Sequence, residues 1–229
     1  MTISKFRDIH KGKTILLVGN GSNLSLTPPE NFDFPTIGMN TIHLYEGWSP
    51  DYFVTVDRRV MREFGEAIEK KFRDIPKFVP APRLNQWHGE NFYRFKNANT
   101  GFLWPKNRRS LWQDDIENEA IIYGNVMHVA IKLAYYMGAK KIIIIGMEHE
   151  PHRSNAKFWG EDKGMSIDQP TKFWQEGYRI LSEVLQSKGV ELLNISQDTF
   201  VPDSIIKTAS WKRFINKPKK KVKKEQDND

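Results

Sequence analysis

Small and polar residues follow the first apolar run of the chain, at a point where a ligand could reach the backbone. The apolar run is Ile-Leu-Leu-Val at residues 15–18. Five small or polar residues come directly after it: Gly19, Asn20, Gly21, Ser22 and Asn23. A buried parallel strand that ends in such a turn leaves N–H groups uncovered, and glycine lets a phosphate or a sugar approach the main chain. The turn therefore predicts a nucleotide site. It lacks the third glycine of the dinucleotide fingerprint and the lysine of the P-loop, so an ordinary tight turn stays an alternative.

Two further apolar runs also end in a polar residue. Residues 36–40 end at Asn40, and residues 52–57 end at Asp57. Ligands of open parallel sheets bind outside the carboxyl ends of the strands, so Asn20, Asn40 and Asp57 are predicted to surround one crevice. Asn and Asp also favour turns, and that alternative explains any one of the three by itself.

A third polar cluster, Glu148-His149-Glu150-Pro151-His152, follows the apolar run at residues 141–145. A histidine near its normal pKa can remove a proton from the hydroxyl group of a substrate, so His149 and His152 are candidate general bases. Glu148 is the third candidate catalytic residue. The spacing His-x-x-His differs from the helical zinc motif, and Pro151 argues against a helix, so no zinc is expected. A solvated polar turn stays an alternative.

Helices and strands alternate around these residues. Apolar residues recur at helical spacing in residues 58–72, 125–137 and 171–188, and short apolar runs at 141–145 and 190–193 indicate strands. This alternation predicts an α/β, Rossmann-like fold with a mainly parallel sheet and helices on both faces. The pattern weakens over residues 77–119, where we expect an irregular, aromatic-rich insertion with a strand at 92–95.

Length and charge predict one folded domain with a basic tail. The chain has 229 residues and a net charge of +7. That size suits a single nucleotide-binding domain over residues 1–216. Residues 207–229 hold nine Lys and Arg against three acidic residues, so the rest of the chain is close to neutral. Residues 217–229 have too little apolar content to pack, and we expect a disordered tail that could contact polyanions weakly.

Composition also excludes cysteine chemistry and argues against a membrane-spanning segment. The absence of cysteine excludes disulfides, thiolate metal sites and cysteine nucleophiles, so any metal would depend on histidine and carboxylate. No apolar run approaches the roughly 20 residues that span a bilayer, and residues 1–10 are charged and polar, unlike an export signal. We therefore expect a cytoplasmic protein without a membrane span. The sequence leaves open whether the chain forms a homo-oligomer.

These motifs together resemble a Rossmann-like family. It includes the 6-hydroxymethylpterin diphosphokinase-like (DUF115) proteins, the motility accessory factors of flagellin glycosylation and the bacterial sialyltransferases. Residues 19–24 resemble the family turn G-x-G-P-S-L, Gly38-Met39-Asn40 resembles the second-strand Asn of the sialyltransferases, and residues 50–57 resemble the diphosphokinase segment P-D-x-x-V-T-x-D. Gly124-Asn125 and the helix expected after them resemble the G-x-V helix of the family. Residues 138–148 resemble its L-G-A-K-x-I and G-x-D motifs, and residues 194–196 resemble its N-x-S motif.

The chain also departs from the family pattern. Ser22-Asn23 replaces Pro-Ser, Tyr123 stands where the sialyltransferases have Ser, and Glu148 replaces the Asp of G-x-D. Residues 149–170 contain no clear equivalent of the sialyltransferases' catalytic His and Tyr. These departures leave the donor undefined.

The resemblance implies three functions. The favoured one is a transferase that uses a nucleotide sugar such as a CMP-sugar and a glycan or small-molecule acceptor. The second is a diphosphokinase in which Asp57 and Glu148 hold Mg²⁺ on ATP. The third is a non-catalytic binding or scaffold protein. The residues expected to contact the nucleotide are Gly19, Asn20, Gly21, Ser22, Asn23, Asn40, Asp57, Gly124 and Asn125.

Overall fold

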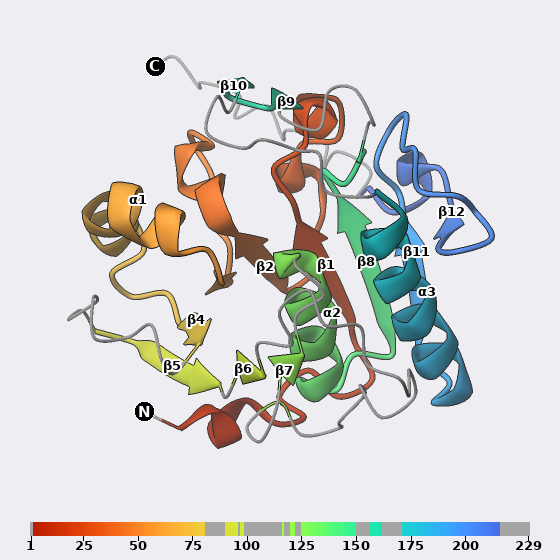
Figure 1. Cartoon of the computed structure of the whole chain (residues 1–229), viewed down its shortest axis with the longest axis horizontal. Helices are drawn as coiled ribbons and strands as arrows, with labels where there is room; N and C mark the ends of the chain where they lie inside the picture. Colours follow the sequence, from red (N-terminus) through yellow and green to blue (C-terminus); the bar gives the residue numbers. More distant parts are fainter. Residues whose placement is uncertain are drawn as a thin grey trace, which may run out of the picture.

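The protein, described from a computed structural model, is built on one large parallel sheet (Figure 1). The structure describes residues 2–80, 90–95, 97–98, 116, 120–121, 125–149, 156–161 and 171–215. The predicted tail at 217–229, most of the predicted insertion, Gly124 and His152 lie outside these residues.

The main sheet has eight strands in the order β12-β11-β8-β1-β2-β3-β4-β5. Their bounds are β1 Thr14–Val18, β2 Thr36–Met39, β3 Tyr52–Val54, β4 Lys77–Pro80, β5 Phe92–Phe95, β8 Lys141–Ile145, β11 Glu191–Asn194 and β12 Lys207–Thr208. Every neighbouring pair is parallel. The α/β, Rossmann-like class predicted from the sequence is therefore confirmed.

Helices cover both faces of the sheet. Helices α2 (Val126–Tyr136) and α3 (Thr171–Ser187) lie side by side on one face of the sheet (Figure 1). Ile142 and Ile144 of β8 pack in the core on this face. Helix α1 (Arg58–Lys71) packs on the other face, which receives Ile143 and Ile145. The central strand β8 is thus buried on both sides, and this explains its continuous apolar run.

Short elements complete the described chain. The 3-10 helices are η1 Ile3–Phe6, η2 Ser22–Leu26, η3 Pro29–Asn31, η4 Asn40–Leu44 and η7 Trp211–Arg213. Strands β6 (Asn97–Ala98) and β7 (Ala120–Ile121) form a separate parallel pair, and β9 (Ala156–Lys157) and β10 (Gly160–Glu161) form an antiparallel hairpin. No helix in the described part of the chain is long and apolar enough to cross a membrane.

The strand expected at 92–95 is confirmed as β5, but the expectation that residues 77–80 and 92–95 belong to an insertion is wrong. Strands β4 and β5 belong to the main sheet, and Phe78 and Tyr93 are fully buried in its core. The signal was obscured by Lys77, which opens β4 and is itself buried. Its Nζ donates hydrogen bonds to the carbonyl oxygens of Arg73, Ile75 and Glu90. A lysine thus occupies a core position because its charge is satisfied by backbone groups.

Candidate functional site

The carboxyl ends of the central strands lie at one edge of the sheet. Because β1, β2, β3 and β8 are all parallel, the residues that follow them share this edge. Asn20 follows β1, Asn40 follows β2, Asp57 lies beyond β3 and Glu148 lies beyond β8. The common edge expected for these four residues is therefore present, while their roles toward a ligand stay predictions.

The space beside the two glycines after β1 is filled by the segment of the protein that follows β8. The N–H of Gly19 donates to the carbonyl of Ile145 at 2.9 Å, and that of Gly21 donates to the carbonyl of Gly146 at 3.0 Å. A Cβ at Gly19 would overlap the Gly146 carbonyl, and a Cβ at Gly21 would overlap the Glu148 carboxyl group. The expectation that these positions leave space for a phosphate is wrong, because the chain after β8 fills that space.

Glu148 is a buried carboxyl group at the centre of this edge. Its side chain packs over Gly21, and the residue is only 5% exposed. Burial raises the pKa of Glu148 to about 7, although bonds from backbone N–H groups, including that of Asn23, and the charge of Lys157 act in the opposite direction. Its Oε1 has no hydrogen-bond partner among the described residues. Glu148 can therefore exchange a proton near neutral pH, as a general base must.

The segment before Glu148 is fixed by side chains at the end of β11 and just after it. Ser196 Oγ accepts from the Met147 N–H at 2.9 Å, and Thr199 Oγ1 donates to the Met147 carbonyl at 2.9 Å. Asn194 Nδ2 donates to the same carbonyl at 3.3 Å, and its Oδ1 accepts from the Ser196 N–H. The N-x-S motif noted in the sequence thus holds both backbone polar groups of Met147, which places Glu148.

Asn20 presents a buried acceptor. Its Nδ2 donates to the Met39 carbonyl at the end of β2, at 3.0 Å, whereas its Oδ1 is buried and has no partner among the described residues. Asn40 instead supports the turn that it opens: it has φ +48°, and its Oδ1 accepts from Thr55 Oγ1 at 2.9 Å. Of these two amides, Asn20 has the oxygen that still requires a donor.

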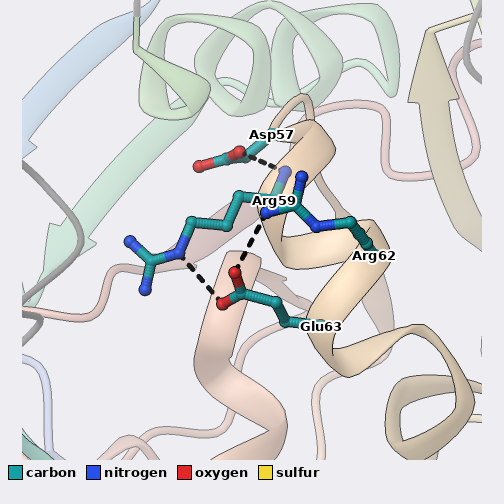
Figure 2. A network of polar contacts seen from close by, with 4 residues as sticks. All are labelled: Asp57, Arg59, Arg62 and Glu63. Atoms are coloured by element: carbon teal, nitrogen blue, oxygen red, sulfur yellow. Dashed lines mark hydrogen bonds and ion pairs between the residues drawn. The ribbon is translucent and has the colours of Figure 1, made fainter.

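Asp57 caps a helix. Its Oδ1 accepts from the Arg59 N–H at 2.8 Å, at the start of α1 (Figure 2). Glu63 is held in turn by Arg59 Nε at 2.9 Å and by Arg62 Nη2 at 3.2 Å. A carboxylate at the N-cap satisfies an otherwise unpaired backbone N–H and interacts favourably with the helix dipole. This local role accounts for an acid at position 57.

The strand order gives no support for a magnesium ion shared by Asp57 and Glu148, which stays a prediction. Strands β3 and β8 are separated in the sheet by β1 and β2. Three strand spacings place their ends about 14 Å apart, whereas two ligands of one Mg²⁺ each lie about 2.1 Å from the ion. Within the described ranges, no group of three or more His, Asp or Glu residues is arranged to hold a metal ion.

His149 packs in a partly buried aromatic group. Its ring centroid is 5.2 Å from that of Trp174 and 5.5 Å from that of Tyr178, and its Nε2 is 2.9 Å from Tyr178 Oη. Asn125 caps α2 through Oδ1 and donates from Nδ2 to the same hydroxyl group at 2.9 Å. Burial lowers the pKa of His149 to about 4. The expectation of a base with a normal pKa is therefore wrong for this residue.

The hairpin of β9 and β10 lies across the ends of β1 and β2 (Figure 1). Lys157 forms an antiparallel bridge with Gly21, and the Phe158 N–H donates to the Asn20 carbonyl at 3.3 Å. The indole of Trp159 donates to Thr41 Oγ1 at 3.1 Å. The hairpin therefore covers the same edge that carries the unpartnered oxygens.

Three of the residues that organise this edge were not singled out from the sequence: Thr55, Lys157 and Tyr178. Tyr178 lies on the buried face of α3, but the apolar stripe predicted for that helix was defined by its aliphatic residues and Phe173. A tyrosine next to such a stripe does signal a buried hydroxyl group that needs a partner. Its partners were not predictable, because they come from α2 and from the segment after β8.

Comparison with solved structures identifies a shared fold, whereas the two sequence comparisons find no relative. No protein-family model matches the chain, and no curated protein matches it. A structure of the sialyltransferase CST-II in complex with a trisaccharide acceptor and CMP matches over 86% of each chain with 10% identity and a TM-score of 0.52. A structure of CstII from Campylobacter jejuni with a substrate analogue, CMP, matches over 88% of this chain and 86% of that chain, with 13% identity and a TM-score of 0.48.

The first of these matches shows that the chain shares the fold of a bacterial sialyltransferase. At 10% identity it shows the fold alone. The sialyltransferase part of the expected resemblance is supported at this level. The resemblance to diphosphokinase-like proteins and motility accessory factors stays a prediction.

Proposed function

We propose that the protein is a nucleotide-sugar-dependent glycosyltransferase that binds a CMP-sugar-like donor at the carboxyl ends of β1, β2 and β8. The observation that carries the proposal is a pair of buried, unpartnered oxygens at this edge: Asn20 Oδ1, in the residue before Gly21, and Glu148 Oε1, in the side chain that packs over Gly21. A buried acceptor without a donor costs about 1–3 kcal/mol. A hydroxyl or amine group of the nucleotide would supply the donor for Asn20 Oδ1, and the hydroxyl group of the acceptor would supply the donor for Glu148 Oε1. The shared fold with CST-II, a protein whose structure contains CMP, supports this choice of donor.

Glu148 is the base in this proposal. A hydroxyl group of the acceptor attacks the anomeric carbon of the donor, and the bond from that carbon to the phosphate oxygen breaks. The nucleotide leaves with the bonding electrons, and the hydroxyl proton passes to the Glu148 carboxylate. A pKa of about 7 suits this task, because the carboxylate is then populated at neutral pH and still accepts a proton.

The competing diphosphokinase function receives less support from the site. It needs Mg²⁺ between phosphates, and the two acids predicted to hold the ion lie at the ends of strands separated by two others. Asp57 also already has a local partner in the N–H of Arg59.

Release of CMP from CMP-sugars, measured with the full chain in the presence of EDTA, tests the proposal. We expect release to increase with pH through about 7, and the Glu148→Gln variant to lose this activity by about 10²-fold or more. Glu66→Gln changes an exposed glutamate of α1 in the same way and serves as the matched control. Activity that requires Mg²⁺ and ATP, or equal activity of the two variants, would overturn the proposal.

A further inference from the structure

Three polar residues from three parts of the chain meet at the hydroxyl group of Tyr178. Asn125 precedes α2, His149 follows β8, and Tyr178 lies in α3 with 0% of its surface exposed. Asn125 Nδ2 and His149 Nε2 both lie 2.9 Å from Tyr178 Oη. His149 adopts φ +52°, which few residues other than glycine tolerate, so the surrounding contacts hold it in place.

The direction of each hydrogen bond in this group is set by one backbone donor. The N–H of Met127 can only donate, so the Asn125 atom that faces it is Oδ1. Nδ2 of Asn125 therefore faces Tyr178 and donates to its oxygen. The single hydroxyl proton of Tyr178 is then free to point at His149 Nε2, which must be unprotonated to accept it.

The opposite arrangement leaves a buried donor unsatisfied. If His149 carried its proton on Nε2, Tyr178 Oη would accept from both neighbours. The hydroxyl proton of Tyr178 would then have no acceptor among the hydrogen bonds of the described residues. A buried, unsatisfied donor is strongly disfavoured.

We infer that Tyr178 is a positioning residue which, together with Asn125, holds His149 as the neutral tautomer protonated on Nδ1, so that His149 donates a hydrogen bond to an anionic oxygen of the donor nucleotide and does not act as a base. The role toward the nucleotide rests on the proposed function, whereas the tautomer does not. His149 lies next to the proposed site because it follows Glu148 directly in the chain. The low pKa of His149 agrees with a neutral ring.

Nitrogen-15 NMR of histidine in the full chain tests the tautomer. The chain has six histidines, and a His149→Gln variant identifies the signal of His149. At pH 8 we expect the wild-type ring to be protonated on Nδ1 and unprotonated on Nε2. Protonation on Nε2 in the wild type would overturn the inference without any further variant.

Asn125→Asp is the sharpest variant, because aspartate still caps α2 but turns an acceptor toward Tyr178. The Tyr178 hydroxyl proton then points at position 125, and His149 must donate from Nε2, so its tautomer reverses. Asn31→Asp makes the same change at an exposed position of η3 and should leave the His149 signals unchanged. An unchanged tautomer in Asn125→Asp, with the helix signals intact, would overturn the inference.

Kinetics separate this inference from the proposed function. In Tyr178→Phe we expect kcat for CMP release to fall roughly fivefold, the effect of one hydrogen bond, with little change in KM. If no nucleotide binds the wild type, the proposed function fails while the tautomer result stands. If CMP-sugar is processed and Tyr178→Phe has wild-type kcat, only the positioning role fails.

Discussion

Position 21 should tolerate alanine only when Glu148 is removed. Gly21 has φ −62° and ψ 156°, a backbone conformation open to any residue. An alanine Cβ would overlap Glu148 Oε2 and lie 2.8 Å from Oε1, so the carboxyl group must move. That movement disrupts the buried packing of the Glu148 side chain. We expect Gly21→Ala to lower the free energy of unfolding by about 1–3 kcal/mol.

In a Glu148→Ala background, Gly21→Ala should instead raise the free energy of unfolding. Alanine then meets no carboxyl group, and it restricts the unfolded chain more than glycine does, which adds about 0.4–1 kcal/mol of stability. The two substitutions are therefore coupled by roughly 1.4–4 kcal/mol. Urea unfolding of the four proteins at pH 8 measures this coupling.

Gly19→Ala is the control for this experiment. Its Cβ would overlap the backbone carbonyl of Gly146, which Glu148→Ala does not remove. The cost of Gly19→Ala should therefore be similar in both backgrounds. An equal cost of Gly21→Ala in both backgrounds would refute the argument that Glu148 requires glycine at position 21.

Three further predictions concern the caps, the buried histidines and the segment before Glu148. Asp57→Ala should lower the free energy of unfolding by about 1 kcal/mol and Asp57→Asn by much less, with or without Mg²⁺, because position 57 acts as an N-cap; a larger loss of stability in EDTA would contradict this. Burial lowers the pKa of His128 to about 3 and that of His149 to about 4. Their unfolded forms bind protons first as the pH falls below 6.5, so stability should decrease from pH 6 to 4 by up to about 1.4 kcal/mol per pH unit for each ring. Urea titrations in a Glu148→Gln background measure this, because the raised pKa of Glu148 has the opposite effect: it stabilises the folded state at low pH and loses this effect as the pH rises toward 7. Ser196→Ala should cost about 1–3 kcal/mol of unfolding free energy, since it leaves the Met147 N–H without an acceptor, and Ser196→Thr should recover part of this; equal stability of the three proteins would contradict the assignment.

The sequence predicted the fold wherever a strand or helix has its own apolar pattern. Residues 141–145 are a strand in both the prediction and the structure, and the helices expected at 58–72 and 125–137 end within a residue or two of α1 and α2. Strand β4 was missed because Lys77 begins it and Pro80 ends it. Its core position depends on backbone acceptors around Lys77, and a local pattern does not reveal them.

The site was predictable in its location and not in its contacts. Strand ends placed Asn20, Asn40, Asp57 and Glu148 at one edge, because parallel strands share their carboxyl ends. The overlap between Gly21 and Glu148 arises from two loops far apart in the sequence, so the glycines were assigned to a ligand. The low pKa of His149 likewise depends on its burial in the folded protein.

Thermal unfolding with nucleotides tests the central claim most directly. Wild-type protein would be heated with CMP, with UDP- and GDP-sugars, and with ATP, each with Mg²⁺ and with EDTA. The account predicts that CMP at 100 times its Kd stabilises the fold by about 2.7 kcal/mol, which raises Tm by roughly 5–10 °C, equally with EDTA and less in an Asn20→Ala variant. Stabilisation by ATP only in the presence of Mg²⁺, or by no nucleotide at all, would contradict it.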